Sequence, residues 1–473
     1  MNERVREILE RLNPWWRAPE ARVTGLKPFR RHEFSRIGER IQRFGEPRLR
    51  AVFLEGLRQV GKTTLAKQVL DELLREGLGG SQVALALAED HRLTGTLTLQ
   101  DVLEAWTPFL DPTRPALLVL DEVHRLKDDS GSGDMNWARQ VKSLVERCDA
   151  GEFQVRILAT GSAAGVIRDG AGILVGRQDV VHLEPLSLEE FVDLRGHPKE
   201  ELQGELDAYL SVGGFPEIAL TTSIPESLER IRQATRSALA ADVPEVRAPD
   251  AIQQLFSILM DQSGEELNEK KLASAIGVQV DSVRRWMQKM EEVHLVHRVQ
   301  RWNTSELREI RGRPKVFGTA AGIVAGFGRT ADPLGDPRLV GRLVEAAVLG
   351  HLRPFAQFRH ARVRCGQKKS PRGQTLGEVD FVMDRPGELL LIEVTSGTAN
   401  LEDKCAFVAA ECKSLASRRR DDSVRGAVVY RGSVRIDGEV SCLPLHAFLL
   451  RLSRPERLET LASLVEGDER QEQ

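Results

Sequence analysis

The sequence has few cysteines, few aromatic residues and no strong net charge. Its 473 residues include five cysteines without a Cys-x-x-Cys pair, which argues against a disulfide framework or a structural zinc site and favours a reducing compartment. The net charge of −3 gives no whole-chain signal for polyanion binding, so any nucleic-acid surface must be local. No uninterrupted apolar stretch approaches the length of a membrane span, and the N-terminus lacks the layout of a secretory signal. These absences predict a cytoplasmic protein without a membrane partner.

What is present favours several packed domains. Aromatic residues make up only 5% of the chain, but the hydrophobic content of 41% is ample for α/β domains, and 473 residues are too many for one core. The first fifty residues hold 12 Arg and 1 Lys against 7 Glu. This segment is either an arm that faces nucleic acid or an Arg-rich helix packed on the neighbouring core.

The most specific motif is the run at residues 56–64, which matches the phosphate-binding pattern GxxxxGKT. A short apolar run at 51–54 precedes it, and apolar residues recur every four positions after it, so we expect a strand, a glycine-rich turn and a helix. That arrangement directs backbone N–H groups and the positive helix end at one point, which suits the phosphates of ATP. Lys62 is expected to reach the β- and γ-phosphates, and the Thr63 hydroxyl to help hold Mg²⁺. The residues assigned to ATP here are Gly56, Gly61, Lys62, Thr63 and Thr64.

A second half of the site follows the apolar run 116–120, which is typical of a parallel strand buried on both faces. The run ends in Asp121-Glu122. We expect Asp121 to anchor Mg²⁺ through water and Glu122 to polarise the attacking water. Because nucleotide binding alone does not need Glu122, the pair predicts an ATPase.

Polar residues next to two further expected strands complete the site. The run 155–159 leads into Thr160 and Ser162, which either sense the γ-phosphate or belong to an ordinary turn with a capping Ser. Arg177 precedes the strand-like run 180–183 and is a candidate arginine finger, acting in cis or from a neighbouring subunit. Arg168 is the rival candidate, and a plain surface arginine is the third interpretation.

The motifs GLRQVGKTT, LVLDEVHRL, ATGSAA, VGR and EPLSLEEF occur in the order found in a group of bacterial and archaeal AAA-type P-loop ATPases, and the chain resembles that group from about Leu49 to Leu450. The resemblance implies a winged helix and a restriction-endonuclease-like domain of unknown function in the second half. It also implies a small helical lid whose Gly-x-Pro turn, with Pro216, lies near the adenine. We therefore expect an N-terminal helical segment at 1–45, an AAA-like domain at 46–195, a lid at 196–249, a winged helix at 250–330 and a nuclease-like domain at 331–460.

Residues 251–317 fit the winged-helix expectation. Short helices are predicted at 270–276 and 281–291, with Val283, Met287 and Met290 on a buried face. A first wing strand is expected at 294–299, and basic residues up to Lys315 follow in a turn-rich segment. Such a module either places its second helix in the DNA major groove or mediates protein contacts. The residues assigned to nucleic acid are Arg284, Arg285, Lys289, Arg311 and Arg313.

The last domain is expected to bring three carboxylates together. Residues 377–382 alternate like a strand, and Pro386-Gly387 turns the chain into a second strand at 389–394. This hairpin would place Asp380 beside Glu393, with Glu345 on an overlying helix, as in the PD-(D/E)xK nuclease core. Thr395 occupies the position where that core has lysine, so the expected site holds metal but cleaves weakly or not at all unless Lys404 substitutes.

The sequence thus predicts an α/β multidomain protein: an AAA+ P-loop ATPase with a helical lid, a winged helix and a PD-(D/E)xK-like domain. The leading function is an ATP-hydrolysing, Mg²⁺-dependent switch or motor that acts on DNA. The alternatives are an ATP-gated nuclease and a nucleotide-controlled scaffold that binds a protein partner without touching DNA. Whether the chain forms a homo-oligomer stays open.

Overall fold

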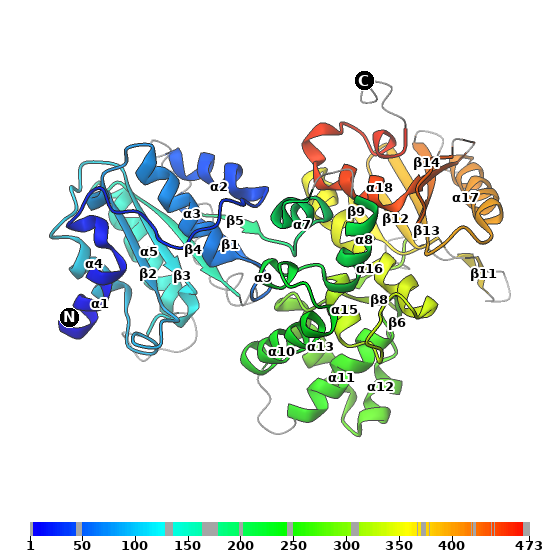
Figure 1. Ribbon diagram of the computed structural model, residues 1–473, viewed down its shortest axis with the longest axis horizontal. Helices are drawn as coiled ribbons and strands as arrows, with labels where there is room; N and C mark the ends of the chain where they lie inside the picture. Colours follow the sequence, from blue (N-terminus) through cyan, green and yellow to red (C-terminus); the bar gives the residue numbers. More distant parts are fainter. Residues whose placement is uncertain are drawn as a thin grey trace. The chain divides into compact units, whose positions relative to one another are not determined.

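The computed structural model describes residues 3–43, 50–127, 136–162, 178–197, 202–243, 249–303, 312–366, 368–369, 375–377, 379–417, 419, 422–436, 438 and 440–466. They form two compact units, Met1–Leu183 and Glu184–Gln473 (Figure 1). None of the described helices is long and apolar enough to cross a lipid bilayer.

The first unit is built on a five-stranded parallel sheet in the order β2-β3-β4-β1-β5. Its strands are β1 (Ala51–Glu55), β2 (Val83–Leu87), β3 (Ala116–Asp121), β4 (Val155–Gly161) and β5 (Gln178–His182). Every residue of β1, β3 and β4 is buried, which explains why these strands are continuous apolar runs rather than alternating ones. The strand expectations at 51–54, 116–120, 155–159 and 180–183 are confirmed, the last ending one residue early.

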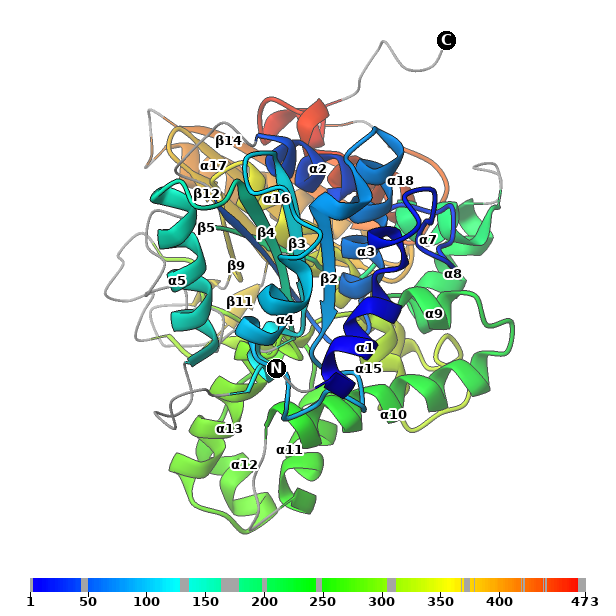
Figure 2. The ribbon, with the colours of Figure 1, turned by 90° about the vertical axis from the view of Figure 1, so that its left-hand side faces the viewer.

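Helices cover both faces of this sheet. Figure 2 shows α3 (Lys62–Arg75) on one side and α5 (Asn136–Asp149) on the other. The connection between β2 and β3 contains α4 (Leu99–Trp106), whose first turn is fixed by a capping box between Thr98 and Asp101. All parallel strands end at the same edge of the sheet, so the turns after β1, β3 and β4 lie close together and can build one site.

The N-terminal segment packs on this core. The helices α1 (Glu3–Leu12) and α2 (Glu33–Gln42) bury their apolar faces. Between them, Asn13 pairs with both backbone groups of Leu85 on the edge strand β2, at 2.9 and 2.6 Å. The indole N–H groups of Trp15 and Trp16 both donate to the Val83 carbonyl, at 2.9 and 2.8 Å. The segment therefore covers a sheet edge, and the second of the two interpretations, a packed Arg-rich helix, fits the structure.

The second unit begins with helices and a small antiparallel sheet. The helices are α7 (Leu188–Arg195), α8 (Leu202–Val212), α9 (Pro216–Ala219), α10 (Ile224–Asp242), α11 (Pro249–Asp261), α12 (Glu269–Ile276), α13 (Val280–Glu292) and α15 (Ala321–Gly326). The sheet has the order β6-β8-β7, with β6 (Glu265–Glu266), β7 (Val296–Val299) and β8 (Lys315–Gly318). Val283, Met287 and Met290 are buried as expected, and Trp286 joins them.

A second five-stranded sheet, in the order β15-β14-β13-β12-β9, forms the C-terminal part of this unit. Its elements are α16 (Pro337–Phe358), β9 (Arg362–Arg364), β12 (Phe381–Arg385), β13 (Glu388–Thr395), α17 (Leu401–Ala416), β14 (Ser423–Tyr430), β15 (Ser441–Pro444) and α18 (Leu445–Ser453). The three strands β9, β12 and β13 are antiparallel, whereas β13, β14 and β15 are parallel. Figure 1 shows α17 on one face and α16 with α18 on the other.

One strand expectation in this part is wrong. The alternating run 377–382 is not a single strand: Gly377 ends β11 (Thr375–Gly377), which pairs with β10 (Lys368–Lys369), while β12 begins at Phe381. Asp380 therefore lies immediately before β12. The hairpin itself is as expected, because Phe381 pairs with Ile392 across the turn at Pro386-Gly387.

Candidate functional site

The loop between β1 and α3 has the backbone shape that a phosphate-binding turn requires. Gly56, Gln59 and Gly61 have φ values of +152°, +64° and +100°. A Cβ on Gly56 would lie 2.3 Å from the Leu183 carbonyl oxygen, so only glycine fits there. Gly61 precedes the first residue of α3, which directs the free N–H groups of that helix end toward the loop.

Lys62, the first residue of α3, is buried and its ammonium group lies within the loop. It donates to the carbonyl oxygens of Gly56 and Leu57 at 2.9 and 3.0 Å. These carbonyls hold the ammonium group at the centre of the turn. The cation and the loop N–H groups together form a pocket for anionic oxygen. Thr64 lies on the exposed side of the same helix turn.

Asp121 connects the loop to the neighbouring strands. Its Oδ1 accepts hydrogen bonds from the Thr63 hydroxyl at 2.8 Å and from the Thr160 hydroxyl at 2.7 Å. Burial raises the pKa of Asp121 above its usual value, although the two hydroxyl donors oppose the shift. A hydroxyl and a carboxylate in contact are the oxygen ligands that Mg²⁺ prefers, so this pair fits the ion that the P-loop implies.

Glu122 follows in the left-handed backbone region, at φ 50° and ψ 54°. Its N–H donates to Thr160 Oγ1 at 3.0 Å, and its Oε2 accepts from the backbone and the hydroxyl of Ser162 at 3.0 and 3.2 Å. His124 Nδ1 lies 3.4 Å from the same oxygen. Burial alone would raise the pKa of Glu122, but the Lys62 and then the His124 charges outweigh it, so the pKa lies below its usual value. The group is thus an ionised acceptor.

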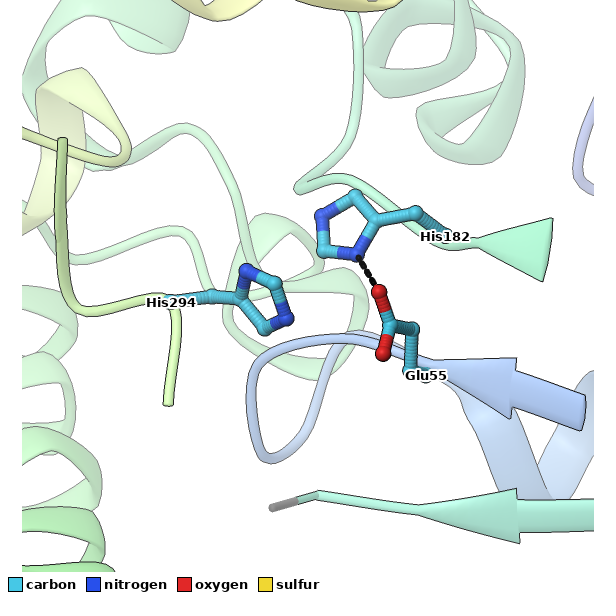
Figure 3. Close-up of side chains that lie close together, drawn as sticks. All are labelled: Glu55, His182 and His294. Atoms are coloured by element: carbon cyan, nitrogen blue, oxygen red, sulfur yellow. Dashed lines mark ion pairs between the residues drawn. The ribbon is translucent and has the colours of Figure 1, made fainter. Parts of the chain in front are cut away.

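Two functional candidates of this unit were missed by the sequence interpretation. One is His124, on the turn Val123–Arg125. Its position two residues after Glu122 was the feature of the sequence that could have indicated a histidine beside this carboxylate. The other is a pair at the ends of adjacent strands, a buried Glu55 and a partly buried His182: His182 Nδ1 lies 3.5 Å from Glu55 Oε1 (Figure 3), where β5 pairs with β1. Glu55 directly precedes the phosphate-binding loop. His294, also drawn in Figure 3, belongs to the second unit.

The described residues do not test the arginine-finger and adenine assignments. Arg177 and its rival Arg168 are outside the described residues. Pro216 belongs to the second unit, where it is the first residue of α9. Its contact with adenine therefore stays a prediction, as does the arginine finger.

The three carboxylates of the C-terminal sheet do come together. Asp380 is partly buried, and its Oδ2 accepts the Val394 N–H at 2.7 Å, beside Glu393 on β13. Burial raises the pKa of Asp380 well above its usual value, and the charges of Glu345 and Glu393 add to the shift. Glu345 is carried by α16. Three acidic groups in such proximity favour a cation or a shared proton.

Two lysines lie at this carboxylate cluster. Lys404, on α17, forms an ion pair with Glu393 Oε1 and also donates to the Val394 carbonyl at 3.4 Å. Thr395, at the end of β13, turns its hydroxyl toward the Gly397 carbonyl instead. Lys315 was assigned to the exposed basic wing, and this is wrong: it is buried on β8, where its charge lowers the pKa of Asp380. Lysine side chains therefore lie at the cluster from α17 and β8, not from position 395, where the nuclease motif has its lysine.

Three of the residues assigned to nucleic acid, Arg284, Arg285 and Lys289, are exposed on α13, but part of their charge is already neutralised. Arg284 forms ion pairs with Glu269 at 2.6 Å and with Asp281 at 3.1 Å, and Lys289 pairs with Glu292 at 2.9 Å. Arg285 and Arg313 are exposed. Arg311 lies outside the described residues.

Two family models match the chain. Residues 203–331 match a domain of unknown function (DUF8612), and residues 48–192 match the AAA domain. The first unit carries an AAA-type P-loop domain. The AAA match covers the parallel sheet, the phosphate-binding loop and the Asp121-Glu122 pair. No curated protein matches the chain.

Similar solved structures include Cdc6p from Pyrobaculum aerophilum, with 12% sequence identity and a TM-score of 0.30; the match covers 67% of this chain and 97% of that chain. AMPPCP-bound DnaA from Aquifex aeolicus has 16% identity and a TM-score of 0.29, and the match covers 56% of this chain and 92% of that chain. The replication initiator DnaA bound to AMPPCP and single-stranded DNA has 17% identity, 54% and 86% coverage and a TM-score of 0.28. TM-scores this low carry no argument about function.

Proposed function

We propose that this protein is an ATP-hydrolysing AAA-type switch or motor that acts on DNA. The observation that supports hydrolysis most directly is the set of hydrogen bonds to Asp121 and Glu122. The Thr63 hydroxyl on α3 and the Thr160 hydroxyl on β4 donate to the Asp121 carboxylate. The backbone N–H and the hydroxyl of Ser162 donate to the Glu122 carboxylate. A site for nucleotide binding alone does not need an ionised, oriented Glu122 beside the first carboxylate.

Each residue of the set has a defined task in this proposal. Lys62 would exchange its two loop carbonyls for phosphate oxygens, and the loop N–H groups would hold the same phosphates. Thr63 and Asp121 would hold Mg²⁺, which supplies charge neutralisation on the transferred phosphoryl group. Glu122 would accept the proton of the attacking water, and its hydrogen bonds to Thr160 and Ser162 would orient it.

The DNA part of the proposal rests on the chain order α11, β6, α12, α13, β7, β8, in which the three strands pair as the sheet β6-β8-β7. This order of elements resembles a winged helix. The exposed positions of α13 carry Arg284, Arg285 and Lys289. Because Arg284 and Lys289 already have acidic partners, phosphates must compete with Glu269 and Glu292. This favours modest, strongly salt-dependent affinity.

ATP turnover measured with and without DNA tests this proposal. DNA should raise turnover, and reversing the charge of Arg285 and Lys289 to Glu should abolish the stimulation and lower the slope of log affinity against log salt by about two. Reversing Arg230 and Arg236, two exposed arginines of α10, is the matched control and should change neither. Stimulation that survives the Arg285/Lys289 double substitution would move DNA contact away from α13. Turnover without any DNA response would favour the nucleotide-controlled scaffold.

A second candidate function, metal-dependent cleavage of nucleic acid, is favoured by one observation. Lys404 reaches Glu393 from α17 and so brings a cation to the carboxylate cluster, which Thr395 cannot do. Asp380, Glu393 and Glu345 would hold the metal, and the metal would supply a hydroxide nucleophile. Lys404 would stabilise the developing negative charge.

A further inference from the structure

Two thiols of the C-terminal sheet are in direct contact. Cys405 on α17 and Cys442 on β15 have their sulfur atoms 2.8 Å apart, although they lie 37 residues apart in the sequence. Cys442 is buried, whereas Cys405 is partly exposed. The contact joins a helix to the outermost parallel strand of the sheet.

The fold dictates this contact. Glu393, Val428 and Cys442 lie side by side across β13, β14 and β15. Side chains in one such row point to the same face, and α17 covers that face. Val428 and Cys442 belong to the buried cluster against which Cys405 packs. The neighbouring helix positions Lys404 and Cys405 thus reach two members of the same row, Glu393 and Cys442.

The other cysteines make poorer partners. Cys412 lies seven residues after Cys405 on the same helix, so about 10 Å of helix rise separates the two. That exceeds the roughly 7 Å limit between the α-carbons of a disulfide. Cys148 lies in the first unit, and Cys365 is buried beside Gln300 and Trp302. The 405–442 pair is therefore the contact that oxidation would convert into a bond.

We propose that Cys405 and Cys442 form a reversible disulfide when the protein meets a peroxide or a small-molecule disulfide. Cys405 is the more accessible thiol, so it reacts first: its sulfur attacks a peroxide oxygen, the O–O bond breaks, and a sulfenic acid and water form. The Cys442 sulfur then attacks the sulfenic sulfur, and water leaves. Two thiols and one hydrogen peroxide thus give one disulfide and two waters.

The roles of the two thiols follow from their surroundings. Burial and then the neighbouring Cys405 raise the pKa of Cys442 to about 12, so Cys442 stays a thiol at neutral pH and acts second. The cross-link would fasten α17 to β15 and close a loop of the intervening residues, which raises the thermal stability of this sheet. It would also restrain the helix turn that carries Lys404.

Counting thiols in the full-length protein tests the proposal. The reduced protein should have five thiols reactive with a maleimide after denaturation, and peroxide treatment should remove two of the five. Dithiothreitol should restore both, and peptide mapping should find Cys405 joined to Cys442. The melting temperature of the oxidised protein should exceed that of the reduced one.

Matched variants sharpen this test. Cys405→Ser, at a partly exposed position, and Cys442→Ser should both prevent the cross-link, whereas Cys412→Ser should leave it intact. Five thiols remaining after peroxide would overturn the proposal. So would a link between Cys412 and Cys442, a link between two chains, or a thiol loss that dithiothreitol does not reverse.

Discussion

Thr160 is the residue whose replacement tests the geometry of the nucleotide site most sharply. Its hydroxyl is fully buried, donates to Asp121 Oδ1 at 2.7 Å and accepts the Glu122 N–H at 3.0 Å. Valine has nearly the same shape but lacks the hydroxyl. Thr160→Val therefore removes one hydrogen bond to a carboxylate and leaves a buried N–H without its acceptor.

The cost follows from these two losses. A hydrogen bond to a charged group contributes about 1.5–3 kcal/mol, and an orphaned buried donor costs about 1–3 kcal/mol. Because the two losses share one hydroxyl they do not simply add, and we expect about 3 kcal/mol less unfolding free energy. At roughly 2–4 °C per kcal/mol for a unit of this size, the melting temperature should fall by about 6–12 °C.

Turnover should fall as well. The Glu122 N–H bond restrains a left-handed backbone that costs about 1–2 kcal/mol to hold, so its loss should lower turnover about tenfold, since 1.36 kcal/mol is one decade. The Thr160 bond also lowers the pKa of Asp121, so that pKa should rise further in the variant. Since Mg²⁺ requires the ionised form, the acid side of the turnover profile should move to higher pH.

The assay is thermal unfolding and Mg²⁺-dependent ATP turnover of full-length wild type, Thr160→Val and Thr160→Ser between pH 5 and pH 9. Serine keeps the hydroxyl and should behave like wild type. If valine and serine give the same melting temperature and the same acid limb, the hydroxyl does not join Asp121 to Glu122 and the reasoning is refuted.

Three further predictions concern single side chains. Ser162→Ala should lower turnover about tenfold without weakening ATP binding, because the Ser162 N–H still donates to Glu122; a fall in affinity instead would make Ser162 a phosphate sensor. With nucleotide absent, Mg²⁺ or Mn²⁺ should raise the melting temperature more at high pH than at low pH. Asp380 has a raised pKa, so its protonated form stabilises the fold, and that stability is lost as pH rises through the folded-state pKa. Asp380→Asn should remove both the rise in melting temperature that the metal causes and the dependence of that rise on pH. In a plasmid assay with Mn²⁺, any cleavage should disappear in Lys404→Ala and persist in Lys413→Ala, a change near the other end of α17; cleavage that survives Lys404→Ala would contradict the role of this lysine.

The parts of the fold that were predictable from sequence are those with a local signal. The strand β3 is a continuous apolar run, the loop 56–64 has fixed spacing, and α13 has apolar residues on one face. Each depends on neighbours in the chain, so each could be placed without a structure. The positions of Asp121 and Glu122 were predictable for the same reason, because β3 ends at Asp121.

What could not be predicted depends on how distant elements dock. Lys404 reaches Glu393 because α17 packs on the face of β13, and Cys405 meets Cys442 for the same reason. Lys315 looked like part of a basic surface segment, yet strand pairing between β8 and β7 buries it. The start of β12 was misplaced because the alternating pattern in the sequence continues past Gly377, where β11 ends, to Phe381, where β12 begins.

The most direct test of the central claim is to measure ATP affinity and ATP turnover separately in Glu122→Gln. Glutamine keeps the size and the hydrogen-bonding oxygen of Glu122 but cannot accept a proton. We expect affinity for ATP with Mg²⁺ to stay within about twofold and turnover to fall by at least about 100-fold, the lower bound for a lost general base. Lys62→Ala should weaken binding itself, and Glu104→Gln on the exposed side of α4 should change nothing. Wild-type turnover in Glu122→Gln would contradict the account.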